Sequence, residues 1–233
     1  MLYSRQSKEA AMNYQAILFD MDGTVLDTLD DLKNAVNAAL EAHGYPLLRR
    51  EQLRRYLGNG SRRLIERALG DSADAQEIDA VLAWYKPYYD AHCHVHTRPY
   101  PGILSMLERL QNAGLRLAIV SNKPDSAVKE LAAAFFPSLN GPALGEREAE
   151  GVRRKPAPDL IDAARESLHL PREVCLYVGD SEVDLLTAQN AGLDCVSVSW
   201  GFRSRDELLA AGAQRIVDTP EALAALIVDE TAP

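Results

Sequence analysis

Two aspartates separated by a single residue follow a short apolar run near the start of the chain. The run covers residues 16–19, and Asp20 and Asp22 come directly after it, around a turn that continues with Gly23 and Thr24. The apolar run predicts a buried strand that carries both carboxylates at its carboxyl end. Neighbouring carboxylates repel each other, and a bound cation or a shared proton relieves that repulsion. Mg²⁺ suits the pair best, because it takes oxygen ligands and completes its shell with water and substrate phosphate.

Two further stretches carry groups that can bind a phosphoryl group. The apolar run 115–120 predicts a strand that ends at Ser121 and Asn122, whose side chains can donate hydrogen bonds to phosphate oxygens. Alone, such residues more often close a turn. Lys155 ends a basic run before a helix expected over 156–168, with Pro156 in its first turn. A lysine there can neutralise phosphate and carboxylates together, although basic runs are usually solvated surface.

Another acidic pair follows a third apolar run. Residues 174–178 predict a strand, Asp180 lies just beyond its end, and Asp184 follows four residues later on the same face of a helix. Acids in the first turn of a helix also interact favourably with its dipole, so helix capping is the alternative role for Asp184.

These groups need a scaffold that brings the ends of several strands together. Strands that alternate with helices predict an α/β fold, a doubly wound parallel sheet with a Rossmann-like core. Residues 28–98 show helical spacing without a strand, which predicts an inserted helical cap. We therefore expect a core of residues 13–27 and 99–233, a cap of 28–98 and a loose leader of 1–12. Residues 141–154 are expected to be mostly loop.

Together, these motifs resemble those of the haloacid dehalogenase superfamily of phosphatases. Its four motifs match, in order, Asp20 to Val25, Ser121, Lys155-Pro156, and Asp180 with Asp184. The resemblance covers the chain from about Asn13 to its end. Within the superfamily the chain is most similar to the phosphoglycolate phosphatase group, through residues 57–61, 97–102 and 199–202.

This resemblance implies a magnesium-dependent hydrolysis of a small phosphate monoester, with 2-phosphoglycolate as the expected substrate. It implies that Asp20 forms a phosphoaspartyl intermediate and that Asp22 acts as general acid and base, with Ser121 and Lys155 completing the catalytic set. The residues expected to contact phosphate or substrate in the core are Gly23, Thr24, Ser121, Asn122 and Lys155. The expected Mg²⁺ ligands are Asp20, Asp22, Asp180 and Asp184.

The expected cap has its own candidates for substrate recognition. The stretch Gly58-Asn59-Gly60 allows backbone amides to approach a ligand closely, and Gly60 is the candidate contact. Arg62 or Arg63 could pair with a substrate carboxylate, although either arginine could equally decorate a helix surface.

Several alternative functions remain open. The same four motifs suit a sugar-phosphate mutase or a phosphatase of another small ester, which product analysis separates. A dehalogenase proper lacks the second acid and the metal, and a non-catalytic module phosphorylated on aspartate would lack both the insert and Asp22. The stretch from His92 to His96 raises a further alternative, a transition-metal site, but a second ligand pair is missing from the sequence.

Composition narrows the classes of partner. The net charge of -9 and the pI near 5.1 argue against broad binding to nucleic acid or an anionic membrane. No apolar run approaches the roughly 18 residues that span a bilayer, and the first 15 residues are too polar for a secretory signal. We expect a cytoplasmic monomer or homodimer that acts on a small phosphorylated metabolite. Cysteines at 93, 175 and 195 are expected to be reduced thiols.

Overall fold

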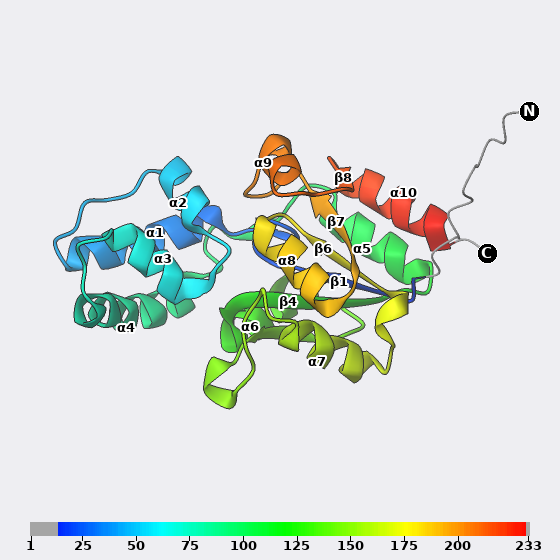
Figure 1. Ribbon diagram of the computed structural model, residues 1–233, viewed down its shortest axis with the longest axis horizontal. Helices are drawn as coiled ribbons and strands as arrows, with labels where there is room; N and C mark the ends of the chain where they lie inside the picture. Colours follow the sequence, from blue (N-terminus) through cyan, green and yellow to red (C-terminus); the bar gives the residue numbers. More distant parts are fainter. Residues whose placement is uncertain (1–13, 232–233) are drawn as a thin grey trace, which may run out of the picture.

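The computed structural model describes residues 14–231, and a six-stranded parallel sheet forms its centre (Figure 1). The strand order is β5-β4-β1-β6-β7-β8, which places the first strand in the middle. The strands are β1 (Ala16–Phe19), β4 (Arg116–Pro124), β5 (Ala143–Glu146), β6 (Cys175–Gly179), β7 (Asp194–Val198) and β8 (Ile216–Val217). This is the doubly wound order, in which ligands bind where the direction of winding reverses, here between β1 and β6. The predicted α/β fold class is confirmed.

Helices cover both faces of the sheet, because its central strands are apolar on both sides. Ile17 and Phe19 of β1 face a core shared with α5 (Ile103–Asn112) and α10 (Pro220–Thr231). Ala16 and Leu18 face the opposite side, which α7 (Asp159–Leu168) and α8 (Glu182–Ala191) cover. Strands buried on both faces read as continuous apolar runs. The remaining core elements are α6 (Asp125–Phe135), α9 (Arg205–Ala210) and the 3-10 turns η1 (Glu148–Glu150) and η2 (Arg172–Val174).

Four helices gather at one end of the molecule, beyond the carboxyl ends of the strands (blue to cyan, Figure 1). They are α1 (Leu29–Ala42), α2 (Arg50–Tyr56), α3 (Gly60–Leu69) and α4 (Ala75–His92). Their contact is apolar, and its buried residues include Val36, Leu53, Ile65 and Val81. These helices occupy the stretch expected to form the cap.

Two short antiparallel strands join the helical end to the sheet end. In this pair β2 (Leu26–Asp27) lies against β3 (Arg98–Pro99), where the chain leaves and re-enters the core. Beside them, the buried carboxylate of Asp31 accepts hydrogen bonds from the backbone N–H groups of His96 and Thr97, at 2.8–3.0 Å. Both connections are therefore tied together. The division into a core and a cap at 27/28 and 98/99 stays a prediction, and the leader 1–12 lies outside the described residues.

Three local expectations were wrong. Residues 143–146 form the edge strand β5 within the stretch expected to be loop. β4 continues through Ser121 and Asn122 to Pro124, so these residues belong to a strand and not to a turn. α7 begins at Asp159, because residues 156–158 form turns before it, and Pro156 is therefore not in its first helical turn.

Candidate active site

Asp20 and Asp22 lie in the loop that follows β1, at the point where the sheet changes its direction of winding. The Asp20 N–H donates to the Val178 carbonyl of β6 at 2.9 Å, which extends the pairing of the two strands into the site. The Asp20 carboxylate accepts from the Met21 N–H at 2.7 Å through Oδ1. The loop is thus held tightly from both sides, and Asp20 is 7% exposed.

Asp180 approaches Asp20 from the end of β6. Its carboxylate accepts a hydrogen bond from the Phe202 N–H and a longer one, at 3.4 Å, from the Thr24 hydroxyl. Gly23 has φ +85°, and a Cβ atom there would lie 2.3 Å from Oδ2 of Asp180. A glycine is required at this position because any side chain would displace the carboxylate.

Gly23 and Thr24 therefore act behind the site. Thr24 is 1% exposed, its carbonyl accepts from the Trp200 indole N–H at 2.9 Å, and neither residue lines the cavity in front of Asp20. The expectation that these two residues contact substrate directly is not met, because their atoms support Asp180 instead.

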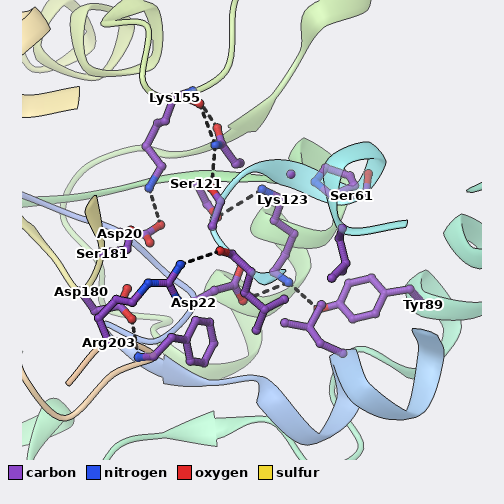
Figure 2. Close-up of a pocket in the computed structure, with 18 of the residues that line it drawn as sticks. Asp20, Asp22, Ser61, Tyr89, Ser121, Lys123, Lys155, Asp180, Ser181 and Arg203 are labelled. Atoms are coloured by element: carbon purple, nitrogen blue, oxygen red, sulfur yellow. Dashed lines mark hydrogen bonds and ion pairs between the residues drawn. The ribbon is translucent and has the colours of Figure 1, made fainter. Parts of the chain in front are cut away.

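Lys155 enters from the loop before α7 and reaches Asp20 directly (Figure 2). Its Nζ lies 2.8 Å from Oδ1 of Asp20 and 2.8 Å from Oδ1 of Asp184, and the Tyr177 hydroxyl completes its hydrogen bonds at 3.0 Å. The side chain is 3% exposed. Three fixed partners therefore hold the ammonium group beside the proposed nucleophile.

Asp184 is buried behind Lys155 and its two oxygens are fully used. Oδ1 accepts from Lys155 and Tyr177, while Oδ2 accepts from the Ser181 hydroxyl at 2.7 Å and from the N–H groups of Asp180 and Ser181. These bonds make Asp184 part of the helix-capping arrangement at the start of α8. Asp184 therefore caps α8 and also lies next to Lys155 in the candidate active site.

Ser121 and Asn122 differ in what they can offer a ligand. The Ser121 side chain is buried and lines the cavity, and its hydroxyl accepts a hydrogen bond from the Lys123 N–H at 3.2 Å. The Asn122 amide donates to the carbonyls of Gly58 and Lys155 and accepts from the Lys155 N–H. Both of its N–H donors are used. Asn122 therefore joins the loop at Gly58, before α3, to the loop at Lys155, before α7, instead of donating to phosphate.

Lys123, two residues beyond Ser121, was not anticipated as a site residue. Its Nζ lies 3.0 Å from Oδ1 of Asp22 and donates to the hydroxyl of Tyr89 on α4. It also lies 4.5 Å from the centre of the Tyr89 ring. The sequence does place a lysine directly after an apolar strand. A lysine buried at such a position needs a partner for its charge, and this could have indicated a site residue.

Arg203 is the second unanticipated cation. Its guanidinium pairs with Glu182 at 2.8 and 2.9 Å and donates to the carbonyls of Arg54 and Leu57 at the end of α2. Arg54 donates in return to the Phe202 carbonyl. This reciprocal contact joins the helical end to the loop that also binds Asp180.

The expected role of Arg62 in substrate binding is wrong for this arrangement. Its guanidinium points along the surface of α3, where it pairs with Asp79 and Glu66, and it does not line the cavity. Arg63 pairs with Glu66 in the same way. Gly60 lines the cavity together with Ser61 and Gly58, and its contact with substrate stays a prediction.

Residues from the sheet end and from the helical end both line the cavity in front of Asp20. Core residues line it on one side, and the helical end closes it with apolar side chains, which are Leu32, Leu57, Leu64, Tyr85 and Tyr89. Its volume is about 60 Å³, room for on the order of four water molecules. Figure 2 shows Lys155 and Lys123 reaching the two aspartates from different directions.

Burial and mutual repulsion strongly perturb the carboxylates. Burial, opposed by Lys155 and reinforced by Asp184 and Asp22, raises the pKa of Asp20 to about 7. Burial and the charges of Asp184 and Asp20 raise the pKa of Asp180 well above its usual range. Burial acts to raise the pKa of Asp184 too, but Lys155, Ser181 and Tyr177 outweigh it and leave that pKa below its ordinary value. The pair most in need of a positive charge is therefore Asp20 and Asp180.

This donor set fits Mg²⁺. Carboxylate oxygens of Asp20, Asp180 and Asp184 lie within 4.8 Å of one another, and all three side chains are buried. Hard oxygen donors are the ligands Mg²⁺ prefers, and a divalent cation offsets the repulsion that raises the two pKa values. Asp184 accepts five hydrogen bonds through its two oxygens. Asp180 accepts two, and Asp20 accepts one besides its ion pair with Lys155. Asp20 and Asp180 therefore keep more lone pairs for an ion.

The described residues contain one other group of potential metal ligands, Cys93, His94 and Glu130. His94 pairs with Glu130 at 3.3 Å on the surface, while His92 contacts the Tyr88 carbonyl. The stretch from His92 to His96 therefore does not converge on one point. All three cysteines are free, and Cys93 and Cys175 are buried, which confirms the expectation of unpaired thiols.

The sheet order, the acidic strand ends and the adjacent lysine define a phosphoryl-transfer enzyme of the α/β class. The sequence model of haloacid dehalogenase-like hydrolases matches residues 17–198. The chain belongs to this family, and it is a phosphoric monoester hydrolase close to the phosphoglycolate phosphatase group.

Relatives support this placement along nearly the whole chain. A phosphoglycolate phosphatase from Vibrio parahaemolyticus is 33% identical over 215 residues, covering 87% of this chain and 91% of the relative. An N-acetylmuramic acid 6-phosphate phosphatase from Pseudomonas aeruginosa is 32% identical, covering 91% and 94%. A crystal structure from Lactobacillus delbrueckii subsp. bulgaricus, described provisionally as a phosphoglycolate phosphatase, superposes with a TM-score of 0.88 at 39% identity, covering 93% and 99%. Within residues 14–231 no helix is long and apolar enough to cross a membrane.

Proposed function

We propose that this phosphatase hydrolyses 2-phosphoglycolate with Mg²⁺ bound, through a phosphoaspartyl intermediate on Asp20. The observation that carries the proposal is the convergence of Asp20, Asp22, Asp180 and Lys155 on one small cavity closed by the helical end. Apolar side chains of the helical end, including Tyr85 and Tyr89, line the cavity with Asp20 and Asp22 and favour a small leaving alcohol over a sugar. Relatives of similar identity are named for phosphoglycolate and for a sugar phosphate, so the cavity is the better guide to substrate.

The reaction proceeds in two displacements at phosphorus. An Asp20 oxygen attacks the phosphorus atom, the bond to the ester oxygen breaks, and Asp22 gives its proton to the departing alkoxide. Asp22 then takes a proton from water, whose oxygen attacks the same phosphorus and releases phosphate from Asp20. One acid therefore serves both steps, because it faces the leaving group first and the water afterwards.

The chain's other polar groups position the phosphoryl oxygens. Lys155, fixed by Asp184 and Tyr177, supplies a positive charge beside Asp20, and the Ser121 hydroxyl can donate from the end of β4. Preorganised donors of this kind stabilise the charge that develops in the transition state. Asp20, the backbone carbonyl of Asp22 and Asp180 would hold Mg²⁺, which when bound supplies Lewis-acid stabilisation of the phosphoryl oxygens.

A panel of phosphate monoesters tests this proposal. Phosphate release is measured for 2-phosphoglycolate, ethyl phosphate, glucose 1-phosphate and a hexosamine 6-phosphate, each with Mg²⁺ and with chelator. We expect the highest kcat/KM for 2-phosphoglycolate, dependence on Mg²⁺, and a loss of at least about 1,000-fold in Asp20→Asn. A higher kcat/KM for the sugar phosphates would contradict the substrate, and isomerised sugar phosphate without release of phosphate would indicate a mutase.

A further inference from the structure

One cation of the cavity has no role in the reaction described above. Lys123 is 5% exposed and lies at the end of β4, and its Nζ faces the cavity beside Asp22. A buried lysine is costly unless its charge is compensated, and within residues 14–231 the one carboxylate paired with Lys123 is that of Asp22, at 3.0 Å. The position of this charge therefore calls for an explanation beyond packing.

The ammonium group of Lys123 also retains an unused donor. Its Nζ donates one hydrogen bond to the Tyr89 hydroxyl and forms an ion pair with Oδ1 of Asp22, and among residues 14–231 it makes no further hydrogen bond or ion pair. The Tyr89 ring lies against the same group at 4.5 Å. Lys123 is thus held in place by α4 and can still bind a further anion.

The other cations near the cavity are already committed. Arg203 is neutralised by Glu182 and also donates to two backbone carbonyls, and Lys155 serves Asp20 and Asp184. Arg62 and Arg63 pair with acids on the surface of α3. By comparison, Lys123 is the cavity cation best able to accept an anionic part of a substrate.

The position of Lys123 indicates which part of the substrate it meets. Asp22 faces the leaving oxygen in the proposed reaction, and Lys155 lies on the side of Asp20. A cation 3.0 Å from the Asp22 carboxylate is therefore beside the leaving alcohol. In 2-phosphoglycolate the carboxylate is separated from the leaving oxygen by one carbon, within reach of this ammonium group.

We propose that Lys123, held by Tyr89, binds the carboxylate of the leaving alcohol and makes the enzyme selective for acidic phosphate esters. The proposal rests on the function proposed above. It makes Lys123 a specificity-determining residue, because an ester without that carboxylate leaves the buried ammonium with its third donor unsatisfied.

The test compares two phosphonates that differ only in the acidic group. In 3-phosphonopropionate a CH₂ group replaces the ester oxygen of 2-phosphoglycolate, and propylphosphonate carries a methyl group in place of the carboxylate. Inhibition constants for both are measured with native protein, Lys123→Gln, Tyr89→Phe and the control Lys129→Gln. Lys129 is an exposed lysine of α6 that pairs with Asp125, away from the cavity lining.

We expect native protein and Lys129→Gln to prefer 3-phosphonopropionate by about 30-fold or more, and Lys123→Gln to lose that preference. Tyr89→Phe keeps the ring and removes one hydrogen bond, so we expect a loss of preference of about 3- to 10-fold. Inhibition by inorganic phosphate and the melting temperature show whether each variant is folded. If folded Lys123→Gln retains the native preference, or if Lys123→Gln is unfolded and Tyr89→Phe retains it, the proposal is overturned.

Failure of this proposal can be told apart from failure of the proposed substrate. Turnover of the ester panel by native protein decides whether 2-phosphoglycolate is the substrate. The ratio of the two inhibition constants decides whether Lys123 reads a carboxylate. A native enzyme that hydrolyses 2-phosphoglycolate best while Lys123→Gln keeps its preference would overturn only the role of Lys123.

Discussion

Replacing Asp184 by asparagine separates its structural role from a role as Mg²⁺ ligand. Five hydrogen bonds converge on the two Asp184 oxygens, from Lys155 and Tyr177 on one side and from Ser181 and the Asp180 N–H on the other. An amide keeps the shape but turns one oxygen into a donor. Facing Ser181, its NH₂ group would leave two buried backbone N–H groups without an acceptor. If the NH₂ group instead faces Lys155, it places one donor against the ammonium group. The Tyr177 hydroxyl can then rotate and accept a hydrogen bond from the NH₂ group.

The orientation with the NH₂ group facing Lys155 costs less free energy, so we use it to calculate the expected loss of stability. Losing a charge-assisted hydrogen bond costs about 1.5 to 3 kcal/mol, and opposed donors add to this. For a total near 3 kcal/mol, the melting temperature of a chain of this length falls by about 6 to 12 °C. Lys155 keeps only Asp20 and Tyr177 as partners, so we expect kcat to fall about 10- to 100-fold through its displacement.

Three measurements decide the role of Asp184: the melting temperature, kcat, and Mg²⁺ affinity by calorimetry. We expect Asp180→Asn to lose at least about tenfold more Mg²⁺ affinity than Asp184→Asn. The control Asp79→Asn changes an exposed acid of α4, and its melting temperature should stay within about 1 °C of the native value. If Asp184→Asn loses as much Mg²⁺ affinity as Asp180→Asn while its stability is unchanged, Asp184 is a direct ligand and the reasoning is refuted.

Three further variants or conditions test other parts of the structure. Gly23→Ala places a Cβ atom 2.3 Å from Asp180, so we expect weaker Mg²⁺ binding by calorimetry and a loss of about 1 to 3 kcal/mol in urea unfolding; unchanged affinity would contradict the close contact. Asp31→Ala leaves the N–H groups of His96 and Thr97 without an acceptor. We expect the free energy of unfolding to fall by about 2 to 6 kcal/mol. A fall below about 1 kcal/mol would show that water replaces the carboxylate. Finally, burial raises the pKa of Asp20 to about 7, so the folded metal-free protein keeps a proton that the unfolded chain has lost, and stability must fall as pH rises from about 4 to 7. Melting of metal-free native protein and of Asp20→Asn over this range measures the difference, and equal slopes would refute the assignment.

The sequence was informative where strand ends carry chemistry. Asp20, Asp22, Lys155 and Asp180 could be placed at one edge because apolar runs fix where each strand ends, and parallel strands bring their carboxyl ends together. The structure brings these four residues to one cavity. Edge strand β5 was missed because its sequence, Ala-Leu-Gly-Glu, is short and contains a glycine, and so resembles a loop.

Side-chain direction was the part that the sequence could not supply. Arg62 lies on α3, close to the loop that lines the cavity, and only the structure shows that it turns toward Asp79. Lys123 was not anticipated as a site residue, and only the structure shows that β4 continues through it and buries its side chain. Tyr89 packs in the apolar core of the helical end, and its hydroxyl also accepts a hydrogen bond from Lys123. Contacts between the helical end and the core depend on packing angles that periodicity does not determine.

The charges of the cavity explain why a closed helical end matters for selectivity. Lys155 is held entirely by core residues, so its charge beside Asp20 does not depend on α4. Lys123 instead depends on Tyr89 of α4, and opening the helical end would remove that partner and expose the ammonium to water. An ion pair weakens as solvent enters, because the effective dielectric constant rises. Binding of a phosphoryl group beside Lys155 should therefore tolerate an open helical end, whereas recognition of a carboxylate by Lys123 should require a closed one.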